Sequence, residues 1–254
     1  ARYGKSTACP TRRSSGVATW PEAGPVAPHF ENPARSGYRL APPTPVSAPA
    51  KADRTVAELE AQARALELKL SRLKAVEEVE RLENIYGYYA DKSMQDAISA
   101  LFAENSTLEI LGRGVFIGRD RVYEYMRRLG VPTHGTLFNH MQLQPVVHVS
   151  EDGNSASVRA RLFVMFGRAD AAAQWGDGVY ENRFVKENGV WKYQSLEGFQ
   201  TFYANYAEGW GKHAVPMMSY FPGYPPDMPT SDDYQPYPAP FVPPFHYVNP
   251  VTRK

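Results

Sequence analysis

The stretch GVYENRFVKENGVWKYQSLEGFQTFY, residues 178–203, decides the fold class of this chain. Both of its halves are rich in valine, tyrosine, phenylalanine and tryptophan, the residue types that are enriched in β-strands. Glu187-Asn188-Gly189 separates the halves, and an Asn-Gly pair favours a tight hairpin turn because both residues tolerate positive φ angles. The stretch therefore predicts two antiparallel strands, over 178–187 and 190–203, joined by a hairpin.

The same pattern extends toward the N-terminus. Residues 137–149 and 156–167 are long runs rich in β-branched and aromatic residues, and Asp152-Gly153-Asn154 supplies a second hairpin turn. Residues 107–117 predict a shorter strand pair, interrupted by Gly112-Arg113-Gly114. The four long strands therefore predict an antiparallel meander.

Helical patterns precede the meander. Thr55, with Glu58 three residues later, is a capping-box pattern that begins a helix ending near Asp91. Amphipathic segments predict two further helices, over 94–105 and 119–129. Leucines recur every seven residues along the first helix and predict a short coiled-coil-like seam, at Leu59, Leu66 and Leu73.

Helices that precede a meander indicate the α+β class. We expect a cone-shaped, curved antiparallel sheet with the N-terminal helices packed on its concave face and a cavity between the two layers. Nine of the 22 prolines lie in residues 1–54 and eleven in 216–254. The sequence thus predicts a Pro/Ala-rich arm over 1–54, a folded domain over 55–210 and a Pro/aromatic-rich arm over 211–254. The rings of this second arm should dock on its own domain or on a neighbouring subunit.

Composition excludes several classes of protein. The net charge is +1 and no basic run exceeds two residues, which excludes a nucleic-acid binder. No apolar run approaches the roughly 18 residues of a membrane span. Cys9 is the only cysteine, no histidine pair has metal-binding spacing, and Gly112-Arg113-Gly114 is too short for a phosphate loop. We expect no metal and no cofactor, and favour a cytoplasmic location, with an exported, periplasmic form as the alternative.

From Val56 to Tyr203 the sequence resembles the SnoaL-like branch of the NTF2-like superfamily. The most specific segments are LENIYGYYAD, residues 82–91, and GVYENRFVKENGVW, residues 178–191. Within this branch the chain is similar to bile-acid dehydratases. It is similar more weakly, through 139–149, 175–182 and the aromatic tail that ends with 243–250, to lyases that release formaldehyde from lignin-derived diarylpropanes. Proteins of this kind form dimers and trimers, so the resemblance implies a homodimer or homotrimer.

The dehydratase resemblance also implies a catalytic site. It places Tyr86 and Asp91 in the pocket and makes His140 the general base. A second aspartate and a second tyrosine of those enzymes align with Val164 and Ile110, so two of their catalytic groups are missing here. The resemblance alone therefore does not establish a dehydration reaction.

Alternatives to this site remain open. Asp91 could simply end the helix, and Tyr86 could be a core residue. Strict alternation places His140 on the same strand face as Phe138. The opposite face carries an apolar set: Leu137, Met141, Leu143 and Val147. If the apolar set faces the core, His140 faces away from the pocket. A polar-lined pocket, or a bulge near the proline at 145, would restore its position.

Six further residues are candidates for substrate binding: Tyr89, Arg113, Tyr180, Glu181, Asn182 and Glu197. Because Tyr180 and Asn182 share a strand face opposite Glu181, these six cannot all line one pocket. The sequence predicts a cofactor-independent lyase that cleaves a C–C or C–O bond of a hydroxylated aromatic small molecule. The alternatives are a dehydratase or isomerase of a steroid-like or polyketide substrate, and a non-catalytic binding or assembly module.

Overall fold

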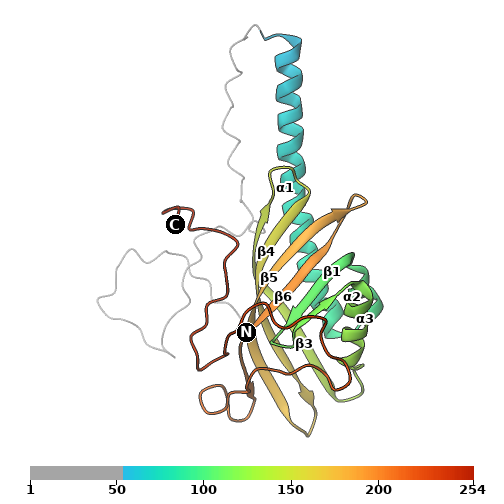
Figure 1. The fold of residues 1–254 in the computed structure, drawn as a ribbon, viewed down its shortest axis with the longest axis vertical. Coiled ribbons are helices and arrows are strands. Elements are labelled where there is room, and N and C mark those ends of the chain that lie inside the picture. The colour runs from blue at the N-terminus through green and yellow to red at the C-terminus, as the bar shows by residue number, and fades with distance from the viewer. Residues whose placement is uncertain (1–53) are drawn as a thin grey trace, which may run out of the picture. The chain divides into compact units, whose positions relative to one another are not determined.

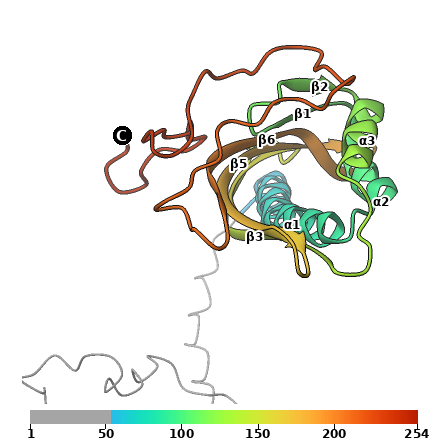
Figure 2. The ribbon, with the colours of Figure 1, turned by 90° about the horizontal axis from the view of Figure 1, so that it is seen from below.

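The computed structural model describes residues 54–254, so the arm predicted over 1–54 lies almost wholly outside the described residues. The described part contains a single six-stranded sheet in the order β2-β1-β6-β5-β4-β3, with helix α1 along its concave face (Figures 1 and 2). The helices are α1 (Val56–Asp91), α2 (Gln95–Ala100) and α3 (Arg119–Arg128). The strands are β1 (Phe102–Ile110), β2 (Val115–Ile117), β3 (Thr136–Val149), β4 (Ser155–Arg168), β5 (Ala173–Glu187) and β6 (Val190–Asn205).

The predicted α+β class and the meander are confirmed. Strands β3 to β6 lie where the sequence places them, and each is antiparallel to the next. Asn188 and Gly189 both have positive φ angles, of 53° and 80°, as an Asn-Gly hairpin turn requires. The sheet is nevertheless mixed, because β1 pairs with β6 in parallel. Within residues 54–254 no helix is long and apolar enough to cross a membrane.

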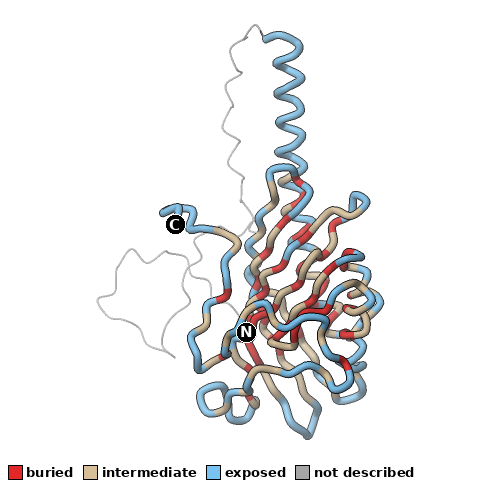
Figure 3. The backbone as a smooth tube through the Cα atoms, in the orientation of Figure 1, coloured by how far each residue is buried: buried red, intermediate tan, exposed pale blue. Residues whose placement is uncertain are grey.

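The capping box begins α1 as predicted. The Glu58 backbone N–H donates to Thr55 Oγ1 over 3.3 Å, and the Thr55 backbone N–H donates to Glu58 Oε2 over 2.8 Å. The C-terminal half of α1 packs into the concave sheet and buries Val79 and Tyr86, whereas its N-terminal half extends past the sheet and is exposed (Figure 3). One helix therefore both closes the core and projects from it.

The second helix is shorter than the sequence predicts. It ends at Ala100, and Phe102 begins β1, where it is completely buried and stacks on Tyr193 with ring centroids 4.9 Å apart. The backbone N–H of Tyr193 donates to the carbonyl of Leu101 over 2.8 Å. Pairing with β6 therefore overrides the helical pattern that continues through residues 101–105.

The C-terminal segment packs on the domain of its own chain. Tyr224 stacks on Phe116 with centroids 5.1 Å apart, and its hydroxyl donates to the Arg121 carbonyl over 2.7 Å. Farther along the chain, Tyr234 stacks on Phe241 at 4.3 Å. Of the two surfaces predicted for the docking of these rings, the structure shows the one on the same chain.

The leucine seam of α1 stays exposed in a single chain: Leu66 is 57% exposed and Leu73 70%. We propose that it packs against a second copy, because a strict seven-residue repeat suits a helix that supercoils with an identical partner. Light scattering should then show a dimer or trimer, and Leu66→Glu should shift it toward monomer. An intact wild-type protein that is monomeric at micromolar concentration would contradict this prediction.

Candidate active site

A cavity of about 580 Å³ lies between the concave face of the sheet, the end of α1, helix α3 and the C-terminal segment. Apolar side chains make up most of its wall, including Ile110, Phe138, Leu162, Val164, Phe166, Met218 and Phe221. A few polar groups interrupt this wall, among them Tyr86, Arg113, Tyr125, His140, Tyr180 and Tyr203. A mostly apolar cavity of this size with few polar groups is typical of a small-molecule site.

A bulge in β3 turns His140 toward this cavity. Gln144 has a φ of +53°, and the register with β4 shifts between Leu143 and Val146. Before the bulge Phe138 and His140 lie on the inner face, and after it Val147 does. Of the other apolar set before the bulge, Leu143 is 38% exposed and does not line the cavity. His140 is only 9% exposed, and the bulge answers the question that strict alternation left open.

Two tyrosines surround the ring of His140. The Tyr180 hydroxyl lies 3.2 Å from His140 Nε2, and the Tyr86 ring meets the imidazole edge-on at 5.6 Å between centroids. Burial lowers the pKa of His140 to about 4 and raises the pKa of both tyrosines. At neutral pH the imidazole is therefore an uncharged proton acceptor beside two protonated hydroxyls.

Asp91 contacts the backbone of His140 and not its ring. Its carboxylate accepts a hydrogen bond from the His140 backbone N–H, and within residues 54–254 the ring Nδ1 has no partner. A Cβ on Gly87 would lie 2.7 Å from the His140 carbonyl, so only glycine permits this close approach of α1 to β3. Asp91 and Gly87 thus fix the position of His140, and Asp91 does not line the cavity.

Of the residues predicted to bind substrate, Arg113 and Tyr180 line the cavity. Arg113 lies in the turn between β1 and β2, and its Nη1 donates to the Tyr125 hydroxyl over 2.6 Å. Tyr89 packs against the core without reaching the cavity wall. Within the described range, no three His, Cys, Asp or Glu side chains are grouped so as to hold a metal ion.

Residues 71–197, half of the chain, match the family of the SnoaL-like domain. The chain belongs to the SnoaL-like family.

Solved structures also resemble this SnoaL-like protein. One, from Novosphingobium aromaticivorans and provisionally described as a scytalone dehydratase, is 24% identical with a TM-score of 0.48, covering 54% of this chain and 91% of the other. An NTF2-like protein from the same organism is 20% identical with a TM-score of 0.42, covering 59% and 92%. A type 2 hexachlorocyclohexane dehydrochlorinase is 19% identical with a TM-score of 0.47, covering 58% and 97%. No curated protein sequence matches the chain significantly.

The SnoaL-like core also buries a carboxylate that the sequence analysis did not single out. Glu83 is completely buried, and the Asn182 side-chain amide lies 3.0 and 2.9 Å from its two oxygens. The Tyr193 hydroxyl donates to Glu83 Oε2 over 3.0 Å. The burial of Glu83 could have been predicted from its spacing along the helix. Glu83 follows Val79 by four residues and precedes Tyr86 by three, which places all three on the buried face of α1. Asn182, a predicted substrate-binding residue, therefore belongs to this buried network and does not line the cavity.

Removing the charge of Glu83 should change how stability depends on pH. Burial raises the pKa of Glu83 from 4.5 to about 7, so the folded protein holds this proton more tightly than the unfolded chain. This stabilisation is complete below pH 4.5 and is lost as the pH rises through 7. Between pH 5 and 8, wild-type stability should fall relative to that of Glu83→Gln by about 1–3 kcal/mol. Parallel stability curves from urea unfolding would contradict this expectation.

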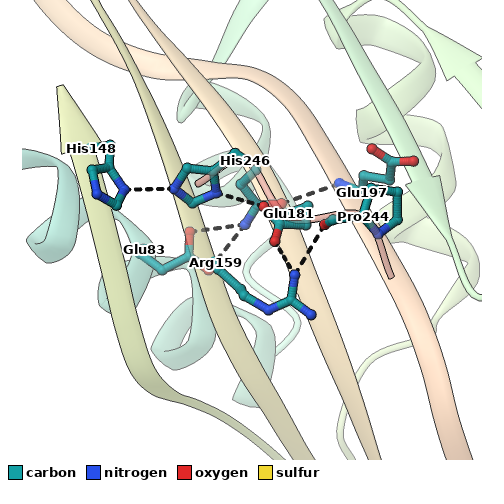
Figure 4. Close-up of polar contacts among 8 residues, drawn as sticks. Glu83, His148, Arg159, Glu181, Glu197, Pro244 and His246 are labelled. Atoms are coloured by element: carbon teal, nitrogen blue, oxygen red, sulfur yellow. Dashed lines mark hydrogen bonds and ion pairs between the residues drawn. The ribbon is translucent and has the colours of Figure 1, made fainter. Parts of the chain in front are cut away.

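Glu181 and Glu197 lie on the face of the sheet opposite the cavity, so the structure does not bring them to His140. Glu181 forms an ion pair with Arg159, and its Oε2 lies 2.7 Å from His246 Nδ1 (Figure 4). The other ring nitrogen of His246, Nε2, lies 2.9 Å from His148 Nδ1. Burial, helped by nearby carboxylates, raises the pKa of Glu197 to about 7. The polar contacts of Glu181 hold the C-terminal segment against the sheet.

Proposed function

We propose that this SnoaL-like protein is a cofactor-independent lyase that cleaves a C–C or C–O bond of a hydroxylated aromatic small molecule. The observation that carries the proposal is the placement of an uncharged His140 between Tyr86 and Tyr180 in the wall of an apolar cavity. The side chains of the protein leave a cavity of about 580 Å³ open, which favours a small-molecule role over that of a purely structural assembly module.

The chemistry follows from the protonation states of these groups. His140 accepts the proton of a substrate hydroxyl, the adjacent C–C bond breaks, and the hydroxyl carbon leaves as formaldehyde. The electron pair of the broken bond stays on the carbon that loses the formaldehyde and is protonated there. Since no carboxylate contacts the ring within the described residues, the imidazolium is unstable and returns its proton to that carbon. Tyr86 and Tyr180 donate hydrogen bonds to the oxygens that gain charge.

The cavity wall favours C–C cleavage over dehydration. Val164 is the cross-strand partner of His140 and lines the cavity, and the sequence resemblance aligns it with an aspartate of the dehydratases. Ile110 also lines the cavity, and the same resemblance aligns it with a tyrosine. The acid that would assist a leaving hydroxyl is therefore absent from both positions.

A dehydratase or isomerase of a steroid-like or polyketide substrate is the second candidate. Tyr180 favours it, because a hydroxyl 3.2 Å from His140 Nε2 could supply the missing acid from a different strand. The two candidates share a base and differ in the bond that breaks and in the product released.

Product analysis separates the two reactions. The wild-type protein is incubated with a diaryl lignin dimer that carries a hydroxymethyl group, and separately with a hydroxysteroid, without cofactor and with a chelator. We expect formaldehyde and an aromatic product in equal amounts from the dimer. Loss of water without formaldehyde would support the dehydratase instead. Conversion that requires an added cofactor would contradict both.

A further inference from the structure

We infer that the cavity binds a substrate whose apolar aromatic body carries an anionic oxygen group, held by Arg113 and the Tyr125 hydroxyl. This inference rests on the proposed function only for the location of the site. The sheet order places β3, with His140, at one edge and the β1–β2 turn, with Arg113, at the other. Anion binding and proton transfer would therefore use different walls of one cavity.

The charge of the cavity wall is the first argument. Within residues 54–254 no aspartate or glutamate lines the cavity, whereas Arg113, Arg128 and Arg168 do. Arg128 forms an ion pair with Glu124, 3.2 Å away, which also pairs with Arg127, and Arg168 is exposed. In the described part of the chain Arg113 has no carboxylate within ion-pair distance. Burying a guanidinium without a counter-ion costs free energy, and an anionic ligand would supply that counter-ion.

The contacts of Arg113 are the second argument. Its three donated hydrogen bonds all end on uncharged atoms: the Tyr125 hydroxyl at 2.6 Å, the Ser219 carbonyl at 3.3 Å and Met218 Sδ at 3.3 Å. A guanidinium has five N–H groups, so each terminal nitrogen keeps one N–H for a ligand. The Phe221 ring packs on the guanidinium, 4.4 Å from Cζ, and holds its plane. Two fixed terminal N–H groups suit a planar, bidentate oxyanion.

Tyr125 supplies a further donor. Its hydroxyl accepts from Arg113, and no hydrogen bond from its own proton is present within residues 54–254. Burial raises the pKa of Tyr125, which keeps that proton in place. At the other wall His140 is uncharged and does not compete for the anion. In an apolar cavity the attraction between Arg113 and an anion is screened less than in water, and cationic ligands are repelled.

Two sources of the anion, a carboxylate and a phenolate, are distinguished with four probes: 4-hydroxycinnamic acid, its methyl ester, 4-methoxycinnamic acid and its methyl ester. Dissociation constants are measured by titration calorimetry at pH 8. If the anion is a carboxylate, the acids bind about 10- to 100-fold tighter than their esters, the scale of a hydrogen bond to a charged group. If it is a phenolate, only the hydroxy probes gain affinity and their absorbance shifts to longer wavelength on binding. Equal affinity for all four probes would overturn the inference.

Variants then assign the preference to Arg113. Arg113→Gln should remove the preference for anionic probes. Its affinity for the methyl ester of 4-methoxycinnamic acid, which carries no ionisable group, should stay within about 2-fold of that of the wild type. Arg113→Lys should keep part of the preference, and Arg183→Gln, on an exposed side chain of β5, should keep all of it. Because Arg113 also contacts the C-terminal segment, Tyr125→Phe serves as a second variant that leaves the charge in place and should lower the preference by several-fold. A preference that survives Arg113→Gln would place the anion elsewhere.

The two proposals fail separately. Binding is measured without turnover, so His140→Ala should keep the preference for anionic probes even as it loses conversion. If wild type prefers anions but converts no hydroxylated aromatic substrate, the proposed lyase activity fails and the anion subsite stands. If wild type converts a neutral substrate but binds charged and neutral probes equally, the anion subsite fails and the proposed lyase activity stands.

Discussion

The His140→Ala variant should convert an identified substrate with a kcat lower by about 10²-fold or more, the usual effect of losing a general base. His140 is the only imidazole in the described part of the cavity wall, and it lies 3.2 Å from the Tyr180 hydroxyl. The fold should remain, since the bulge and the Asp91 contact to the His140 backbone do not involve the imidazole. Steady-state kinetics and circular dichroism together test this expectation.

The matched control is His134→Ala, because His134 is exposed and outside the cavity wall. Tyr86→Phe should also lower kcat by about 10²-fold. The pH profile adds a readout: with a pKa of about 4, His140 stays an active base down to pH 5, so kcat should fall only below that value. Full activity in both the His140 and Tyr86 variants would move the search to Arg113 and the other tyrosines.

The fold was predictable because local chemistry and long-range packing agree in most of this chain. Asn188-Gly189 forms its hairpin and the Thr55–Glu58 box begins its helix, as the residue types alone dictate. The exception is α2, where a helical pattern continues into residues that pair with β6 instead. Parallel pairing of β1 with β6 joins residues far apart in sequence, and no local pattern encodes it.

The candidate site was predictable only in part. The resemblance gave Tyr86 and His140, but the orientation of His140 depends on a bulge at Gln144, which alternation does not show. Glu181 was chosen as a polar residue in a specific motif, although its strand position aims it away from the cavity. Met218 and Phe221 line the cavity from a proline-rich segment that follows the SnoaL-like match over Val56–Tyr203. Such contributions require the packed structure.

Truncation after Val215 should lower the activity strongly, because it removes one wall of the cavity. Met218 and Phe221 would be lost, and with them the contacts that hold Arg113. Loss of Tyr224 would uncover Phe116, a cost of about 3–5 kcal/mol by comparison with truncated buried aromatic residues. We expect kcat/KM to fall by at least about 10²-fold, since substrate positioning and water exclusion are both impaired, and Tm to fall as well.

Truncation after Asp233 is the matched control. It keeps Met218, Phe221 and the Tyr224 contacts but removes Tyr234 and Phe241, which pack on Phe199 from outside the cavity. This variant should lose stability while retaining most of its kcat/KM. Light scattering on both truncations also tests whether the segment contributes to assembly. If the protein truncated after Val215 kept full activity, the C-terminal segment would pack on the domain without contributing to the site, and neither Met218 nor Phe221 would shape it.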